Sequence, residues 1–153
     1  NPLLYESIRR YALRLLADSD AANDVVQEVF LRFKQHQSKI NQPRAWAYRT
    51  ARNLVIDRFR QTKTTELTNS IPAKATQFNP VLLTEKKEEI EMIQQKINNL
   101  SAKHREVLRL KFQEGLKYAE IADVLGEPVT TVAWLLHEAI TLLRKEVGIN
   151  NVN

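Results

Sequence analysis

The chain of 153 residues contains no cysteine, so disulfide bonds and thiolate metal ligands are excluded. Its three glycines are too few for a glycine-rich phosphate-binding loop, and His36, His104 and His137 do not stand at metal-ligand spacing. No apolar run approaches the roughly 18 residues that a membrane span requires, so no membrane insertion is expected. These absences predict no catalytic residues, no metal and no cofactor, and they favour a cytoplasmic binding protein over an enzyme.

Helical periodicity is what the N-terminal part does contain. Apolar residues at helical spacing predict a first helix over Leu3–Leu16. A second helix is predicted after a cap at Ser19 or Asp20. A third is expected to begin at Pro43 and to end near Arg60. Proline suits the first position of a helix, because an N–H there would have no acceptor within the helix.

The C-terminal part repeats this pattern after an interruption. The 24-residue stretch Gln61–Thr84 is polar and broken by proline, which indicates a linker that can extend to about 80 Å. Four more helices are predicted over Glu85–Asn99, Ala102–Gln113, Tyr118–Leu125 and Pro128–Lys145, and no stretch alternates like a strand. The expected fold is all-α, with two small helical domains at residues 1–60 and 85–148 joined by a flexible linker at 61–84.

The positive charge of the chain is concentrated in one segment. Between Arg32 and Lys63 the only acid is Asp57, against nine basic residues, which gives a net charge of +8: Arg32, Lys34, Lys39, Arg44, Arg49, Arg52, Arg58, Arg60 and Lys63. A solvated helix face normally interleaves acids with its bases. The near absence of acids therefore favours a polyanion as the partner of this segment.

Tyr118–Leu136 fits a helix-turn-helix. Ala122 is small enough for two helices to approach, Gly126 suits the turn, and Val132 follows six residues later to close the small core. A plain helical hairpin can show the same spacing, so the spacing leaves both a DNA-binding motif and a structural hairpin open.

Three blocks together resemble the sigma-70 family of RNA polymerase sigma factors, in its extracytoplasmic-function (ECF) branch. Asp24–Arg32 is similar to a helix of the family's region 2, Pro43–Asp57 to the promoter-melting helix, and Leu100–Ala122 to region 4. The resemblance implies that residues 1–60 bind the β′ clamp of core RNA polymerase and melt the −10 region. It further implies that residues 85–148 bind the β flap, and that the partners include promoter DNA and an anti-sigma factor. The composition of the last helix adds a DNA-bound recruiting protein as an alternative partner.

The resemblance also assigns roles to single residues. The polymerase-binding set is Asp24, Gln27, Glu28 and Phe30, and the DNA-binding set on the basic segment is Lys39, Arg44, Arg49, Arg52, Asn53 and Arg60. Arginines suit phosphates, and an asparagine can contact a base. The loop 37–42 is expected to wall a pocket for a flipped base. Trp46 either stacks on an unpaired base or belongs to the core, and its helical spacing with Leu54 favours the core.

The last helix departs from the family pattern. ECF sigma factors usually carry basic residues near its start, whereas this chain has no lysine or arginine from Pro128 to Ile140. Polar candidates for base contacts there are Thr130, Thr131 and His137, and the apolar Val129, Ala133 and Trp134 form a possible partner patch. Direct reading of the −35 element is therefore expected to be weak or partner-dependent. The alternative for Trp134 is packing against the preceding helix.

Two rival functions follow from the same residues. A sigma-like protein that sequesters an anti-sigma factor without initiating transcription needs no DNA-binding arginines, and the basic segment argues against it. A dimeric repressor predicts a basic recognition helix, which this chain lacks. An initiation factor that binds core polymerase and directs promoter recognition and melting is the favoured function.

Overall fold

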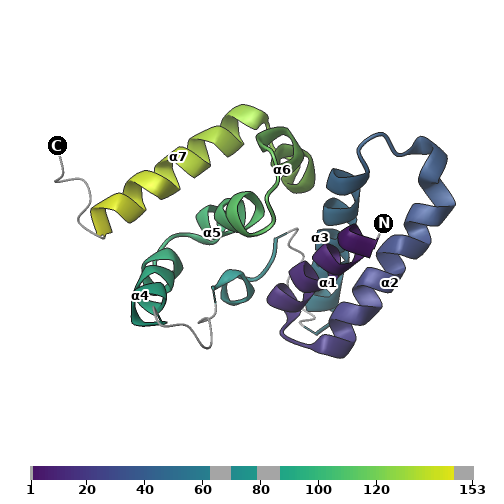
Figure 1. The fold of residues 1–153 in the computed structure, drawn as a ribbon, viewed down its shortest axis with the longest axis horizontal. Helices are drawn as coiled ribbons and strands as arrows, with labels where there is room; N and C mark the ends of the chain where they lie inside the picture. The colour runs from purple at the N-terminus through teal and green to yellow at the C-terminus, as the bar shows by residue number, and fades with distance from the viewer. Residues whose placement is uncertain (1, 63–69, 79–86, 147–153) are drawn as a thin grey trace.

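The computed structural model describes residues 2–62, 70–78 and 87–146, and over these ranges it contains helices and turns but no strand. The α-helices are α1 (Pro2–Leu16), α2 (Ser19–His36), α3 (Pro43–Thr62), α4 (Lys87–Asn98), α5 (Ala102–Leu108), α6 (Tyr118–Leu125) and α7 (Val129–Glu146). Shorter turns are η1 (Gln37–Lys39), η2 (Ala73–Thr76) and η3 (Arg109–Gln113), the last a π-helical extension of α5. Figure 1 shows α1–α3 as one group and α4–α7 as another, which confirms the all-α prediction.

The first group closes around side chains that recur at helical spacing. Ile8 and Tyr11 of α1 are buried against Val25 and Val29 of α2, and alanines on α3 let that helix approach both neighbours. The rings of Tyr11 and Tyr48 meet edge to face, with centroids 5.1 Å apart. This core fixes which side of α3 remains available for function.

The start of α2 differs from the prediction. The cap is Asp18, whose carboxylate accepts a hydrogen bond of 3.1 Å from the backbone N–H of Ala21. Ser19 and Asp20, the predicted caps, are already helical. The prediction was wrong by one residue because it did not foresee the left-handed turn at Ala17 (φ 53°), which places Asp18 in the extended conformation of a cap.

The second group contains the predicted two-helix motif. Ser101 caps α5 as predicted, with its hydroxyl accepting from the backbone N–H of His104. Gly126 ends α6 in the left-handed region (φ 67°), where a side chain would be strained. Ile121 and Val132 are completely buried, so α6 and α7 are joined by the small core that the spacing indicated.

Part of the predicted linker packs against both groups. Residues 63–69 and 79–86 lie outside the described residues, as do 147 and 148 of the predicted second domain, and α3 extends past the predicted boundary to Thr62. In the segment Ser70–Phe78, the turn η2 contacts α1 and α5, and Ile71, Thr76 and Phe78 are buried. The sequence alone does not predict this packing, because the apolar residues of the segment are isolated and follow no helical period.

Two arginines of the second group hold this segment. Arg105 donates to the hydroxyl of Thr76 at 2.9 Å and to the carbonyl of Ala73, while Arg109 donates to the carbonyls of Thr76 and Gln77 and covers the ring of Phe78. Burial away from water lowers the pKa of both guanidinium groups. The two arginines thus donate hydrogen bonds to backbone carbonyls of the segment, of which that of Ala73 also accepts from the hydroxyl of Thr76.

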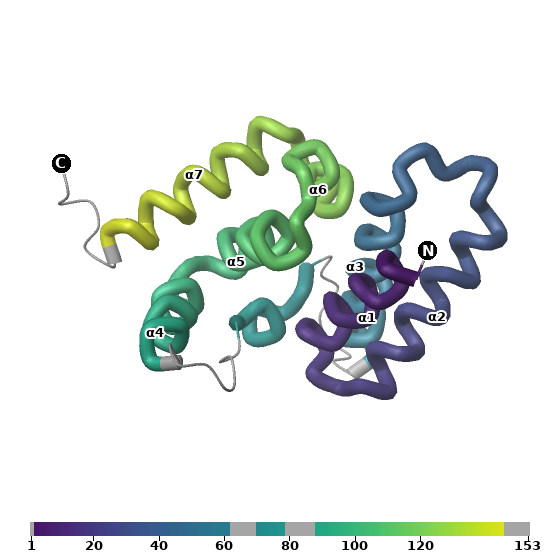
Figure 2. The backbone as a smooth tube through the Cα atoms, in the orientation of Figure 1, coloured from purple at the N-terminus to yellow at the C-terminus, as the bar shows by residue number. Residues whose placement is uncertain are grey.

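The two helical groups meet along α3 and α6, as the tube in Figure 2 also shows. The basic helix α3 is therefore covered on one side by the second group. This contact determines how the predicted DNA-binding residues are presented.

Candidate nucleic-acid interface

The predicted DNA-binding residues of α3 share one side of the helix. Arg49, Arg52, Asn53 and Arg60 recur at helical spacing, and all four line a cleft of about 440 Å³ between α3 and α6. The opposite wall is the end of α6, Val124–Gly126. The structure thus places four side chains of the predicted DNA-binding set on one face of α3, opposite the second group.

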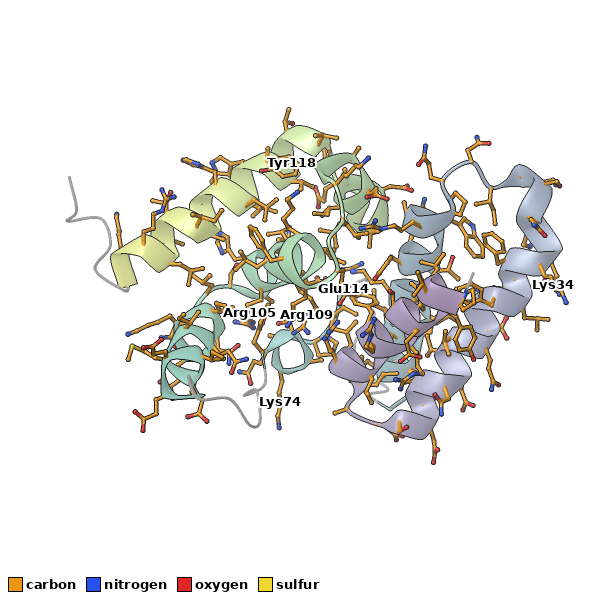
Figure 3. All side chains as sticks on the ribbon, viewed as in Figure 1. Lys34, Lys74, Arg105, Arg109, Glu114 and Tyr118 are labelled. Carbon is orange, nitrogen blue, oxygen red and sulfur yellow. The ribbon has the colours of Figure 1, made fainter. Side chains whose placement is uncertain are left out.

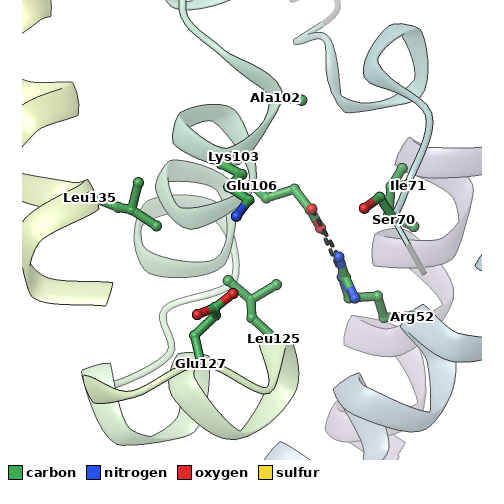
Figure 4. Close-up of a pocket in the computed structure, with 9 residues that line it drawn as sticks. All are labelled: Arg52, Ser70, Ile71, Ala102, Lys103, Glu106, Leu125, Glu127 and Leu135. Atoms are coloured by element: carbon green, nitrogen blue, oxygen red, sulfur yellow. Dashed lines mark hydrogen bonds and ion pairs between the residues drawn. The ribbon is translucent and has the colours of Figure 1, made fainter. Parts of the chain in front are cut away.

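Arg52 is the most deeply placed of the four. It is 9% exposed and forms a two-pronged pair with Glu106 of α5, Nε to Oε1 at 2.9 Å and the second nitrogen to Oε2 at 3.0 Å. Figure 4 shows this pair bridging the two groups beside a cleft. Burial alone would lower the pKa of Arg52, but the hydrogen bonds and charge of Glu106 outweigh it and raise the pKa.

Two further arginines of α3 also face acids of the second group. Arg49 lies 3.4 Å from a carboxylate oxygen of Asp123, and Arg44 lies 3.7 Å from Glu120. Arg44 also donates to the backbone carbonyls of Glu114 and Gly115. Three of the arginines expected to hold DNA phosphates therefore hold carboxylates in this arrangement.

Glu114 ties the first group to the loop that follows η3. Its carboxylate accepts from Arg14 of α1 at 2.5 Å and from the hydroxyl of Tyr48 of α3 at 2.8 Å. Burial, and then the negative charge of Glu114, raise the pKa of the Tyr48 phenol, so the hydroxyl stays a hydrogen-bond donor. Figure 3 labels Glu114 where the two groups adjoin.

Sequence reasoning missed these acids as functional residues. Glu106, Glu114, Glu120 and Asp123 lie 54 to 100 positions from their partners, beyond any local pattern. A usable signal exists only for Glu106, an acid directly before the apolar Val107 and Leu108 in a short helix, where burial of a charge requires a partner. The other three acids carry no such signal.

The predicted polymerase-binding residues lie on α2. Asp24 and Gln27 are exposed and Glu28 is half-buried, so they form an accessible polar face; Asp24 pairs with Arg58 and Glu28 with Arg32. Phe30 is different, because its half-buried ring packs against Tyr5 at a centroid distance of 5.2 Å. It is partly accessible beside the polar face.

The connection between α2 and α3 contains the remaining predicted residues of the first group. Lys39 is exposed at the end of η1, and the loop 37–42 is exposed apart from Ile40. Trp46 packs against the core, and its ring meets Phe33 edge to face at 5.7 Å. Of the two alternatives for this tryptophan, the structure supports packing of its side chain against the core.

The start of α7 presents an apolar surface. Trp134 is 58% exposed and Val129 46% exposed, with Thr130 and His137 exposed and Thr131 and Ala133 half-buried between them. The alternative that Trp134 is covered by the preceding helix does not hold, because more than half of the side chain is accessible. Val129, Ala133 and Trp134 are hereafter called the α7 patch.

Within the described ranges, no three histidine, aspartate or glutamate side chains gather in a way that could hold a metal ion. The helices described were also searched for membrane spans, and none is long and apolar enough to cross a bilayer.

Comparison with protein families identifies the class to which this architecture belongs. Residues 4–65 match the model of sigma-70 region 2, and residues 90–143 match that of sigma-70 region 4. The first match covers α1–α3 and the second covers most of α4–α7. The chain belongs to the sigma-70 family, in the ECF group, and is a promoter-directing RNA polymerase sigma factor.

Individual relatives agree with this assignment. The chain is 36% identical to the ECF RNA polymerase sigma factor SigL of Mycobacterium tuberculosis over 92% of this chain and 84% of the relative. It is 32% identical to the ECF RNA polymerase sigma factor SigW of Bacillus subtilis, over 93% and 83% of the two chains. Its fold resembles that of the sigma factor RpoE of Bartonella quintana, solved with the anti-sigma factor NepR, with a TM-score of 0.64, 20% identity and coverage of 97% and 94%.

Proposed function

We propose that the α3 surface formed by Arg44, Arg49, Arg52, Asn53 and Arg60, together with Lys39, binds the promoter −10 region and stabilises its melted strand. The observation that carries this proposal is the cleft between α3 and α6, which gathers four of these side chains along one helix face. Guanidinium groups spaced along a helix suit successive phosphates, and the exposed amide of Asn53 suits a base edge. The exposed loop 37–42 adjoins α3 and would wall the pocket for a flipped base.

The polar face of α2 is the proposed contact with the β′ clamp of core polymerase. Asp24, Gln27 and Glu28 are accessible, and the two acids already accept from arginines within the chain. Exchange of these internal partners for arginines of a partner helix would preserve each charge-assisted hydrogen bond. Phe30 would add a partly accessible apolar contact at the edge of this face.

A groove between α4 and α7 is the proposed contact with the β flap. Its floor is Met92, Ile93, Ile140 and Leu143, and its volume is about 460 Å³. Met92 and Ile93 are about half exposed and are contiguous with the other apolar side chains of the groove. An apolar groove of this kind suits an amphipathic helix of a partner.

The α7 patch is the proposed contact with a DNA-bound recruiting protein. Phosphate affinity requires cations, and the first three turns of α7 have none, so Thr130, Thr131 and His137 are left as weak readers of the −35 element. An exposed tryptophan at the centre of an apolar patch is the typical anchor of a protein interface. An anti-sigma factor, such as the one bound in the Bartonella quintana structure, is a second proposed partner.

In this proposal the protein acts by binding in the cytoplasm, where polymerase works, and the polymerase supplies the catalysis. The competing function is that of a decoy that sequesters an anti-sigma factor without initiating transcription. A decoy has no use for the exposed guanidinium of Arg49 or the exposed amide of Asn53, and both support initiation.

Transcription from a library of templates tests the proposal. Core polymerase alone and core with the purified chain would transcribe templates with randomised −35 and −10 segments, and the transcripts would be sequenced. We expect transcripts that depend on the chain, with a required −10 sequence and little demand at −35. A chain that binds core without producing transcripts would refute initiation and favour the decoy.

A further inference from the structure

We propose that the free chain forms a symmetric dimer through the groove between α4 and α7, in which the α4 helices of two copies pack antiparallel. The groove would then have two partners, a second copy of the chain and polymerase, and each would exclude the other. The dimer itself is argued from α4 alone, whereas its competition with polymerase rests on the β-flap contact proposed above.

One side of α4 holds the helix in the second group, and the opposite side is exposed. Gln94 is buried, and the side chain of Asn98 binds both the backbone N–H of Phe78 at 2.7 Å and its carbonyl at 2.9 Å. The helical period therefore turns Met92 and Ile93 outward, where they are 55% and 49% exposed. Two large apolar side chains side by side in water form the centre of a surface that a partner would cover.

The residues of α4 on the groove side are complementary to themselves. In chain order an acid, two apolar residues and a base line the groove: Glu89, Met92, Ile93 and Lys96. Their spacing places them in one stripe along the helix. When two such stripes run antiparallel, Glu89 of each copy meets Lys96 of the other, and the apolar residues meet at the centre. This reciprocity is what a two-fold symmetric dimer requires.

The charges also select the orientation of the two helices. A parallel pairing would set Glu89 against Glu89 and Lys96 against Lys96, and like charges at these positions would oppose it. The ammonium of Lys96 has three N–H donors, so it can bind a carboxylate of the second copy beside its contacts within its own chain. The antiparallel pairing is therefore the favoured one.

The distribution of charge over the chain permits two copies to meet at α4. Residues 85–153 contain ten basic and eleven acidic residues, whereas the basic segment 32–63 carries +8. Figure 1 shows α4 on the side of the second group that faces away from α1–α3. Two copies joined at α4 therefore bring together nearly neutral surfaces and keep their basic segments apart.

The dimer is expected to be weak, because its apolar centre is small. It would form where free chain is concentrated and would dissociate as polymerase takes up the monomer, since both partners cover the same groove. The dimer would thus hold a reserve of the chain that cannot bind core.

Sedimentation equilibrium of the full chain, from about 1 to 300 µM at low salt, would measure the dimer. Glu89→Lys and Lys96→Glu should each weaken it about fivefold or more, because each sets like charges against one another in both symmetric pairs. The two single variants mixed together, and the double variant, should recover the affinity of the parent.

Glu88→Lys is the matched control. It reverses an exposed charge in the same first turn of α4, but outside the stripe, and should leave the dimer intact. Circular dichroism melting would confirm that all variants fold. A parent that stays monomeric over the whole range would overturn the dimer. A double variant and a mixture that dimerise as poorly as the single variants would overturn the antiparallel pairing.

Met92→Cys tests the competition, because the chain has no other cysteine and Met92 lies beside the two-fold axis. Mild oxidation should join two copies by a disulfide. Anisotropy with fluorescent core polymerase would compare the linked form with the same protein after reduction, and the linked form should bind core about tenfold or more weakly. Equal binding would overturn the competition. With the dimer supported by sedimentation, the failure would then lie in the β-flap contact proposed for the groove.

Discussion

At the scale of single residues, Arg52 shows why a buried charge needs a partner of opposite sign. Arginine is always charged, so a buried arginine must be paired, and Glu106 provides that pair here. Loss of only one partner from a buried pair costs about 3–5 kcal/mol of stability.

The polar face of α2 gives the sharpest prediction for a single residue. Glu28→Lys should weaken binding to core polymerase about tenfold or more, because a like charge would face the arginines of the clamp. Fluorescence anisotropy with labelled chain and core would measure the dissociation constant, and helicity by circular dichroism should not change.

Glu6→Lys is the matched control for this prediction. Glu6 is on α1, is 46% exposed against 42% for Glu28, and likewise pairs with an arginine of its own helix. The clamp assignment fails if the two variants bind core with equal affinity.

At the scale of elements, the helices were predictable and the segment between the groups was not. Helical periodicity, the helix start at Pro43 and the caps at Ser101 and Gly126 follow from local chemistry, so their positions could be read from the sequence. The packing of Ile71 and Phe78 depends on Arg105 and Arg109, about 30 residues further along the chain, so no local sequence pattern predicts it.

Helix α7 carries the second prediction at this scale. We expect transcription by the parent to change less than about twofold when the −35 segment is scrambled, since the helix has no cation at its start to hold phosphates. Thr130→Lys with Ala133→Lys should add duplex affinity and steepen the slope of log K against log salt by about 1.8. These positions are accessible, whereas Leu135 is buried and a charge there would disturb the core.

Competition between intact and scrambled templates would measure the demand at −35. Anisotropy during a salt titration would measure the gain in duplex affinity and its salt dependence. Loss of transcription by the parent on scrambled templates, with no partner present, would mean that α7 reads the −35 element despite its composition. The recruiting role of the α7 patch would then be withdrawn.

At the scale of the whole molecule, the packing of the two groups sets the arginines of α3 against acids of α5 and α6. The basic segment and the selection of DNA-binding residues could be derived from the sequence, because charge and family pattern are both local. The pairing of Arg44, Arg49 and Arg52 with acids could not, because it joins residues that only the packing of α3 on α5 and α6 brings together.

The central claim is that α3 melts the promoter, and permanganate footprinting of unpaired thymines tests it most directly. Core polymerase saturated with the parent, with Arg49→Ala plus Asn53→Ala, or with the control Arg10→Ala plus Asn99→Ala would be bound to a promoter selected from the template library. Saturation with core keeps polymerase binding equal for the three proteins. The account predicts strong thymine reactivity in the −10 region for the parent and the control, and weak reactivity for the α3 variant at equal core occupancy. Equal reactivity for all three proteins would contradict it.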